Sequence, residues 1–170
     1  MDIIIRPEIT KDIPAIFHVN KLAFDRENEA QLVDALRKED AVILSLVAEL
    51  DRQIVGHILF SPVTITNDDL QWQAVGLGPM AVLPEFQGKG IGSTLIRSGL
   101  DELKKLGHDV VIVLGHSEYY PRFGFKPSKH FGIQWETDVP EDVFMVAELS
   151  GGALSGRRGI VRYHSAFKDV

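Results

Sequence analysis

The stretch Val82-Leu83-Pro84-Glu85-Phe86-Gln87-Gly88-Lys89-Gly90-Ile91-Gly92-Ser93 joins a strand-like segment to a helix-like one. The apolar run ends, a turn begins at Pro84, and three glycines alternate over Gly88–Gly92. Such small residues let the main chain turn tightly and direct several N–H groups toward one point. The first turn of the following helix adds unpaired donors and a partial positive charge. The stretch therefore predicts an anion site, of which a pyrophosphate is the usual occupant, with Lys89 at its rim.

Two familiar phosphate motifs do not fit this loop. A P-loop requires Gly-x-x-x-x-Gly-Lys-Ser/Thr, whereas Lys89 is followed here by glycine. A Rossmann fingerprint requires Gly-x-Gly-x-x-Gly after a first strand, whereas this loop reads Gly-x-Gly-x-Gly in the middle of the chain. On glycine spacing alone, the alternative is a tight strand-to-helix turn that binds no ligand.

The residues before the loop predict one short strand, two helices and three further strands. A strand over Ile3–Arg6 stops at Pro7, and Thr10 is expected to cap a helix because its hydroxyl can accept a main-chain N–H. That helix should carry four apolar side chains on one side, which are Ile13, Ile16, Phe17 and Phe24. A second amphipathic helix is expected over Glu27–Lys38, with the inward residues Leu32, Val33 and Leu36. Apolar segments then predict an antiparallel meander of strands at Val42–Glu49, Gln53–Val63 and Gln71–Val82.

The residues after the loop predict a long helix and three strands. The helix, Ile91–Leu106, is followed by Gly107, where a helix cap is expected. Its apolar stripe consists of Leu95, Ile96, Gly99, Leu100, Leu103 and Leu106. Asp109–Leu114 is a nearly continuous apolar run, which is typical of a strand buried on both faces. A short helical or looped piece at Glu118–Phe123 precedes the last two strands, expected at Val143–Leu149 and Gly159–Tyr163.

The order of these elements, β-α-α-β-β-β-α-β-α-β-β, describes a mixed α/β fold. A hairpin-rich first half joined to a β-α-β unit predicts a largely antiparallel sheet with helices on both faces. The chain has 170 residues, 45% of them hydrophobic and 25% charged, which is the composition of an ordinary globular protein. No repeat or linker divides it, so we expect a single domain over residues 1–170.

Charge and composition argue against several classes of protein. The 18 Lys and Arg against 24 Asp and Glu give a net charge of −6, which disfavours a nucleic-acid-binding surface. The absence of cysteine excludes a disulfide framework and a thiolate nucleophile. The six histidines lack metal-ligand spacing and no Gly-x-Ser-x-Gly occurs, so we expect neither a metal site nor a serine hydrolase. The N-terminus does not read as a signal peptide and no apolar run could span a bilayer, so we expect a cytoplasmic protein without a membrane partner.

The longer pattern around the glycine loop closely resembles the acetyl-CoA signature of the GNAT superfamily of N-acetyltransferases. The pattern reads Val82-x-Pro84-x-x-Gln87-Gly88-x-Gly90-Ile91-Gly92, and the Q/R-x-x-G-x-G/A core of the signature falls on Gln87, Gly90 and Gly92. Downstream, Tyr119-Tyr120-Pro121-Arg122-Phe123-Gly124-Phe125 resembles the family's later Tyr-x-x-x-Gly-Phe motif. The element order also matches, the resemblance covers most of the chain, and the stretch from Tyr120 onward is most similar to the bacterial YhbS-type branch.

The resemblance implies a fold, a cosubstrate and the residues that hold it. It implies an acetyl-CoA-binding core at about 71–125, in which main-chain amides of the glycine loop hold the pyrophosphate of coenzyme A. The strand before the loop would bulge at Gly78-Pro79 and pair with the pantetheine arm, and a free amide there would bind the thioester oxygen. The matching cofactor-binding positions are Met80, Ala81, Val82, Gln87, Gly88, Lys89, Gly90, Ile91, Gly92 and Ser93.

Acetyl transfer to an amine also requires an acid for the departing thiolate and a way to deprotonate the amine. By the family pattern Tyr120 is the acid, since a phenol with a pKa near ~10 can protonate a thiolate as it leaves. The alternative is that Tyr120 is a core aromatic residue whose hydroxyl is satisfied by a main-chain carbonyl. Tyr119 would take the acid role if the turn is shifted by one residue. The strand Gln71–Val82 contains no Asp or Glu, which departs from the family pattern for the base. Four candidates remain, acting directly or through a water: Glu85, His57, His116 and Glu118.

These features predict an N-acetyltransferase that uses acetyl-CoA and a primary amine in a direct ternary complex, with no metal. The alternative is an acyl-CoA sensor or a partner-binding module on the same fold, which the strand without a carboxylate keeps open. The use of longer acyl-CoA thioesters is a third possibility. The acceptor walls are expected from the two N-terminal helices over Ile13–Lys38 and from the Lys126–Glu141 loop, whose residues match no substrate rule. The C-terminal strands, at about 143–163, would also allow a homodimer.

Overall fold

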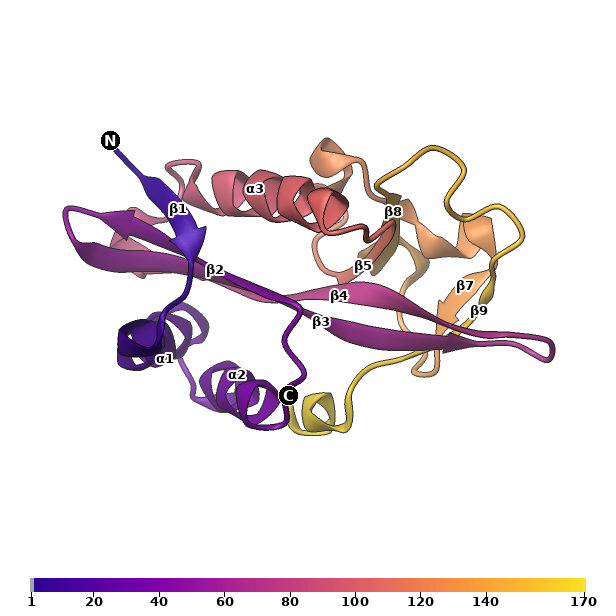
Figure 1. Cartoon of the computed structure of the whole chain (residues 1–170), viewed down its shortest axis with the longest axis horizontal. Helices are drawn as coiled ribbons and strands as arrows, with labels where there is room; N and C mark the ends of the chain where they lie inside the picture. The colour runs from indigo at the N-terminus through magenta and orange to yellow at the C-terminus, as the bar shows by residue number, and fades with distance from the viewer. Residues whose placement is uncertain (1) are drawn as a thin grey trace. The chain divides into compact units, whose positions relative to one another are not determined.

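The computed structural model describes residues 2–170 (Figure 1). Its strands are β1 (Ile4–Pro7), β2 (Leu44–Leu50), β3 (Gln53–Thr66), β4 (Gln71–Val82), β5 (Val110–Leu114), β6 (Lys126–Pro127), β7 (Ile133–Trp135), β8 (Phe144–Glu148) and β9 (Gly159–Arg162). Its α-helices are α1 (Ile13–Phe24), α2 (Asn28–Lys38) and α3 (Ile91–Lys105). Short 3-10 helices cover Thr10–Asp12, Pro84–Phe86, Tyr120–Phe123, Ser128–Phe131, Glu141–Val143 and Ser165–Asp169.

The chain forms two compact units, and β3, β4 and α3 each contribute residues to both. The first unit contains the residues up to Ser61 together with Gly78–Asp101 and Ser165–Val170. The second unit contains Pro62–Leu77 and Glu102–His164. The expectation of a single domain over the whole chain stays a prediction.

In the first unit, hydrogen bonds join the strands in the order β1-β2-β3-β4, and β2 runs antiparallel to both β1 and β3. Successive side chains of a strand point to opposite faces of the sheet. Accordingly, Gly56 of β3 lies against Leu95 of α3, whereas its neighbour His57 hydrogen-bonds to Asn20 of α1. The helices therefore cover both faces, with α1 and α2 below the sheet and α3 above it in Figure 1.

The start of α1 differs from the prediction. The main-chain N–H of Ile9 donates to the carboxylate of Asp12 at 2.8 Å, and the same carboxylate pairs with Arg6. Thr10 lies inside the 3-10 turn that leads into the helix, so its predicted capping role is wrong. Phe24, expected on the buried side, is 37% exposed because it is the last residue before the chain turns out of the helix.

The helix α3 begins at the predicted residue and packs closely on β3. A Cβ atom at Gly99 would lie 2.5 Å from two ring carbons of Phe60, so only a glycine permits this approach. The helix ends as expected at Gly107, whose φ is +91° and whose N–H donates to the Lys104 carbonyl at 3.1 Å. Leu106 lies beyond the last helical turn and is 55% exposed, so its predicted place in the apolar stripe is wrong.

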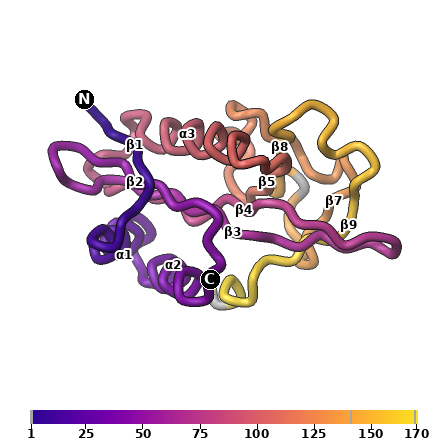
Figure 2. Tube along the Cα trace, viewed as in Figure 1, coloured from indigo at the N-terminus to yellow at the C-terminus, as the bar shows by residue number. Residues whose placement is uncertain are grey.

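In the second unit, β4 pairs in parallel with β5, and β8 pairs antiparallel with both β5 and β6. The last strand, β9, pairs antiparallel with β3 and in parallel with β7. The connection 149–158 loops out between β8 and β9 (Figure 2). A Cβ atom at Gly159 would lie 2.5 Å from the Thr66 carbonyl oxygen, so this glycine lets β9 reach β3. The sequence did not predict the two short strands β6 and β7.

These pairings confirm the predicted fold class of a mixed, mostly antiparallel sheet with helices. Five of the pairings within the units are antiparallel and two are parallel. Within residues 2–170, no helix has both the length and the apolar character needed to cross a membrane.

Candidate functional site

The glycine loop begins where β4 ends and is held there by main-chain hydrogen bonds. The N–H of Leu83 donates to the Val55 carbonyl of β3 at 2.9 Å, which fixes the end of β4. The 3-10 turn Pro84–Phe86 follows, and the chain then reverses through Gly88 and Gly90, whose φ angles are +74° and +84°. Only glycine adopts such angles without a steric penalty, so the loop conformation depends on these two residues.

The loop presents a set of main-chain donors in front of α3. The N–H of Thr94 donates to the Gly90 carbonyl at 3.0 Å and marks the first hydrogen bond of the helix. Within the part of the chain that the structure describes, no hydrogen-bond acceptor is found for the N–H groups of residues 88–92. These donors add to the positive end of the helix dipole, which is the arrangement that attracts phosphate groups.

Two side chains of the loop have roles that the glycine spacing did not reveal. The Gln87 amide donates to the Val82 carbonyl at 2.9 Å, so Gln87 links the loop back to the end of β4. The Lys89 ammonium lies 5.6 Å from the centre of the Phe86 ring, which holds this charge beside the loop. Neither contact uses a main-chain N–H group of residues 88–92.

The strand before the loop changes its pairing at the predicted dipeptide. The register between β4 and β5 ends with Leu77 opposite Val113. The next peptide bond, Gly78-Pro79, is cis, and Gly78 has a φ of +140°. The main chain of Met80, Ala81 and Val82 therefore lies beyond the last residue of β4 that pairs with β5.

Tyr120 lies in the 3-10 helix that follows β5 and is 7% exposed. Its ring contacts Gly115 so closely that a Cβ atom there would lie 2.3 Å from the ring. The rings of Tyr119 and Phe125 meet it edge-on, at centroid distances of 5.2 and 5.7 Å. Burial in this aromatic surrounding raises the pKa of the Tyr120 hydroxyl to about 12. No hydrogen-bond partner of that hydroxyl is found among the described residues.

Three of the four candidate bases are exposed side chains. Glu85 lies in the turn after β4, and His116 and Glu118 lie in the segment between β5 and the 3-10 helix of Tyr120. The loop and Glu85 belong to the first unit, whereas His116, Glu118 and Tyr120 belong to the second. The side chains of Glu85, His116 and Glu118 are all in contact with solvent.

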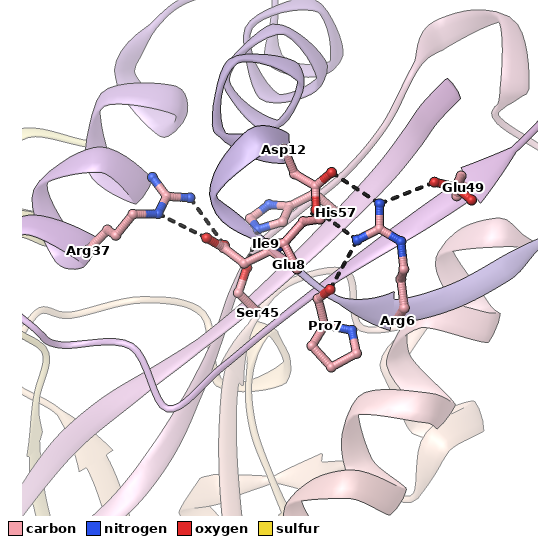
Figure 3. A network of polar contacts seen from close by, with 9 residues as sticks. All are labelled: Arg6, Pro7, Glu8, Ile9, Asp12, Arg37, Ser45, Glu49 and His57. Carbon is pink, nitrogen blue, oxygen red and sulfur yellow. Dashed lines mark hydrogen bonds and ion pairs between the residues drawn. The ribbon is translucent and has the colours of Figure 1, made fainter. Parts of the chain in front are cut away.

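His57, the fourth candidate, is fully buried in a polar network of the first unit (Figure 3). The Asn20 amide nitrogen lies 3.1 Å from His57 Nδ1, and the same nitrogen donates to the Ile16 carbonyl at 3.0 Å. Because that nitrogen is a donor, Nδ1 accepts, and the ring proton of the neutral histidine is on Nε2. Nε2 lies 2.9 Å from Ser45 Oγ, to which it then donates. Burial lowers the pKa of His57 to about 4, although Glu8 acts in the opposite direction.

The network continues from Ser45 to a salt bridge near the surface. The Ser45 hydroxyl donates to Glu8, and the carboxylate of Glu8 also accepts from Nε and Nη2 of Arg37 at 3.0 and 3.1 Å. These hydrogen bonds lower the pKa of Glu8 against the opposing effect of its partial burial. His57 is thus a neutral core residue whose donors and acceptors are satisfied, and the structure argues against it as the base.

Comparisons with known proteins agree with this geometry. Residues 5–128 match the family described as "Acetyltransferase (GNAT) domain". The chain is 38% identical over 165 residues to "Uncharacterized N-acetyltransferase YhbS" of Escherichia coli K12, covering 96% of this chain and 98% of that protein. It is similar to the crystal structure of E. coli YhbS in complex with CoA, with a TM-score of 0.90 at 38% identity, covering 97% of this chain and 91% of that one. It is also similar to a GNAT family acetyltransferase from Brucella melitensis in complex with acetyl-CoA, with a TM-score of 0.81 at 38% identity and 98% of each chain covered.

Proposed function

The chain belongs to the GNAT family of acetyl-CoA-dependent N-acetyltransferases, and we propose that it transfers the acetyl group of acetyl-CoA to a primary amine within a ternary complex. The observation that carries this proposal is the row of main-chain N–H groups at residues 88–92, which have no acceptor among the described residues. The crystal structures of two relatives, each 38% identical to this chain, contain CoA or acetyl-CoA.

The loop is proposed to hold the pyrophosphate of the cosubstrate. Its main-chain amides at residues 88–92 would bind the phosphate oxygens, with Lys89 adding a charge at the rim. The main chain of Met80, Ala81 and Val82 is proposed to pair with the pantetheine arm. A main-chain amide there would donate to the thioester oxygen and stabilise the negative charge that develops on it.

The transfer itself exchanges one bond for another. The neutral amine attacks the thioester carbonyl carbon, a C–N bond forms, and the electron pair of the carbonyl moves to the oxygen. When the carbonyl forms again, the C–S bond breaks and coenzyme A leaves as a thiolate. The amide nitrogen loses one proton to a base or to water, and the thiolate gains one proton, so the charge balances.

Tyr120 is proposed as the acid that acts on the departing thiolate of coenzyme A. A pKa of about 12 keeps its hydroxyl protonated throughout the neutral range. Since a thiol has a pKa near ~8.5, complete proton transfer from Tyr120 would be uphill by about 5 kcal/mol. We therefore infer that the hydroxyl acts chiefly by donating a hydrogen bond to the sulfur as its negative charge grows.

The base is proposed to be water or one of the exposed groups. Glu85 and His116 both lie in contact with solvent and would relay the proton of the amine to it. An acceptor amine that is partly neutral at the working pH needs no stronger base. The buried His57 has no part in this step.

Release of coenzyme A with a panel of primary amines tests the proposal, with Tyr120→Phe compared with Tyr119→Phe. Tyr120→Phe should lower kcat by roughly 10²- to 10⁴-fold while the KM for acetyl-CoA stays the same. Tyr119→Phe is a matched control because it removes a neighbouring phenol from the same aromatic cluster. This variant should retain most of the activity. Saturable binding of acetyl-CoA, seen as shifts of the amide resonances of residues 88–92, without turnover on any amine would identify an acyl-CoA sensor instead.

A further inference from the structure

A cavity of about 230 Å³ lies in the second unit, within the segment from which the sequence predicted part of the acceptor walls. Its walls include the apolar side chains of Ile133 and Val139 and the rings of Trp135 and Phe144. Trp135 and Phe144 are stacked at a centroid distance of 6.2 Å, with an angle of 16° between their planes. The edge of Tyr163 supports Trp135 at 5.8 Å, so the cavity has a firm aromatic wall.

The cavity is also lined by polar side chains. Ser128, a residue only 3% exposed, is one of them. Asp138 is another; it is an exposed residue, and its carboxylate forms no ion pair with any residue that the structure describes. Lys129 is a further lining residue, but it already makes an interaction of its own. A carboxylate at the mouth of a cavity, beside an aromatic face, forms a suitable surrounding for an ammonium group.

The cavity adjoins the end of the strand that leads to Tyr120. Phe144 is the register partner of Leu114, the last residue of β5. The next residue, Gly115, donates its N–H to the Val143 carbonyl at 2.9 Å and is covered by the ring of Tyr120. The cavity and the proposed acid therefore lie at the same end of β5 within one unit, with Phe144 on the face of Leu114 and Tyr120 on that of the next residue, Gly115.

We propose that this cavity binds a second, non-reacting ammonium group of the acceptor, so that the acceptor is an alkyl diamine. The inference rests on the proposed function, because it concerns the amine that this function acetylates. A carboxylate beside an amine stabilises its charged form, and a charged ammonium has no electron pair with which to attack a thioester. The group that Asp138 holds therefore stays protonated, and the amine that reacts is the other one.

Binding of 1,5-diaminopentane to the whole protein tests this site without any turnover. The probe and its monoamine counterpart, pentylamine, are titrated while the indole N–H resonances of the two tryptophans are recorded. The Trp135 signal is assigned with Trp135→Phe. The diamine should shift it saturably and bind about tenfold more tightly than pentylamine. Equal affinities for the two amines, or a Trp135 signal that does not move at millimolar diamine, would overturn the inference.

Asp138→Asn removes the proposed charge, and Asp142→Asn makes the same change at an exposed residue four positions away that does not line the cavity. The first variant should weaken diamine binding about tenfold and raise the KM for the diamine by a similar factor, with kcat little changed. The second should do neither, and equal effects of the two variants would contradict the site. Diamine binding at Trp135 without release of coenzyme A would refute the transferase proposal alone. Turnover of amines with an unmoved Trp135 signal would refute the cavity alone.

Discussion

His57 gives the clearest test of the network in the first unit. In the folded protein it is fully buried and neutral, with Nδ1 accepting from Asn20 and Nε2 donating to Ser45. In the unfolded chain it is hydrated and free to take a proton. Replacing it by glutamine (His57→Gln) retains a hydrogen-bonding side chain but removes the titratable group. The variant should therefore lose a specific part of the pH dependence of stability.

The size of that part follows from the pKa of His57. Burial lowers it from 6.5 to about 4, and each pH unit of difference between the folded and unfolded states corresponds to about 1.4 kcal/mol. Between pH 6.5 and pH 4 the unfolded state binds a proton that the folded state does not. The contribution of His57 to the free energy of unfolding is fully present above pH 6.5. It falls by about 3 kcal/mol as the pH drops to 4.

Urea unfolding at half-unit steps of pH from 7 to 4.5 measures this slope. The unfolding free energy of the wild type should fall more steeply than that of His57→Gln, by about 1.4 kcal/mol per pH unit at the acid end. His18→Gln makes the same change on the exposed side of α1 and should reproduce the wild-type curve. Equal slopes for the wild type and His57→Gln would refute the reasoning. If His57→Gln does not fold, the ring resonances of His57 in the wild type should titrate near pH 4, and a midpoint near 6.5 would contradict it.

Further predictions concern three glycines and the acceptor. Gly99→Ala should lower the unfolding free energy by roughly 1–3 kcal/mol in a urea titration, because its methyl group would meet Phe60 at 2.5 Å, and Phe60→Leu in the same chain should restore part of the loss. Gly115→Ala should displace the ring of Tyr120 and lower kcat at least tenfold while acetyl-CoA still binds. Unchanged turnover would show that Tyr120 takes no part in the chemical step. Gly90→Ala should weaken acetyl-CoA binding about tenfold by calorimetry, since an alanine is strained at a φ of +84°, and unchanged affinity would argue against the loop as the pyrophosphate site. The pH midpoint of kcat/KM should follow the pKa of the amine used, and a midpoint common to all amines would point to a protein base instead.

The elements that could be predicted from the sequence are those with a strong local pattern. β4 was predicted at its observed bounds, Gln71–Val82, because its alternating and β-branched residues lie between clear turn signals. The short strands β6 and β7 have two and three residues and no pattern of their own. They exist only because β8 and β9 offer them hydrogen bonds, which is a property of the folded chain. Asp12 takes the place predicted for Thr10 for a similar reason, since its partner Arg6 lies on a strand.

The same distinction between local patterns and properties of the folded chain applies to the site. The glycine loop is local, so its turn and its row of N–H groups without an acceptor could be predicted from the order of residues alone. The contact between Gly115 and Tyr120 is also short in sequence, but its closeness is visible only in three dimensions. The environment of His57 depends on Asn20 of α1, Ser45 of β2 and Glu8 of the segment after β1. No sequence pattern could distinguish this buried, neutral histidine from an exposed base.

These observations all concern how the acceptor amine loses its proton. A strand without carboxylates removes the base that the family pattern would place before the loop, and the buried network of His57 removes the remaining internal one. The described candidates that remain, Glu85, His116 and Glu118, are all exposed to solvent. In the proposed mechanism, the rate would therefore depend on how much of the acceptor is already neutral. In a diamine, the charge on one ammonium lowers the pKa of the other, so a site that keeps the first group protonated also favours the neutral form of the second.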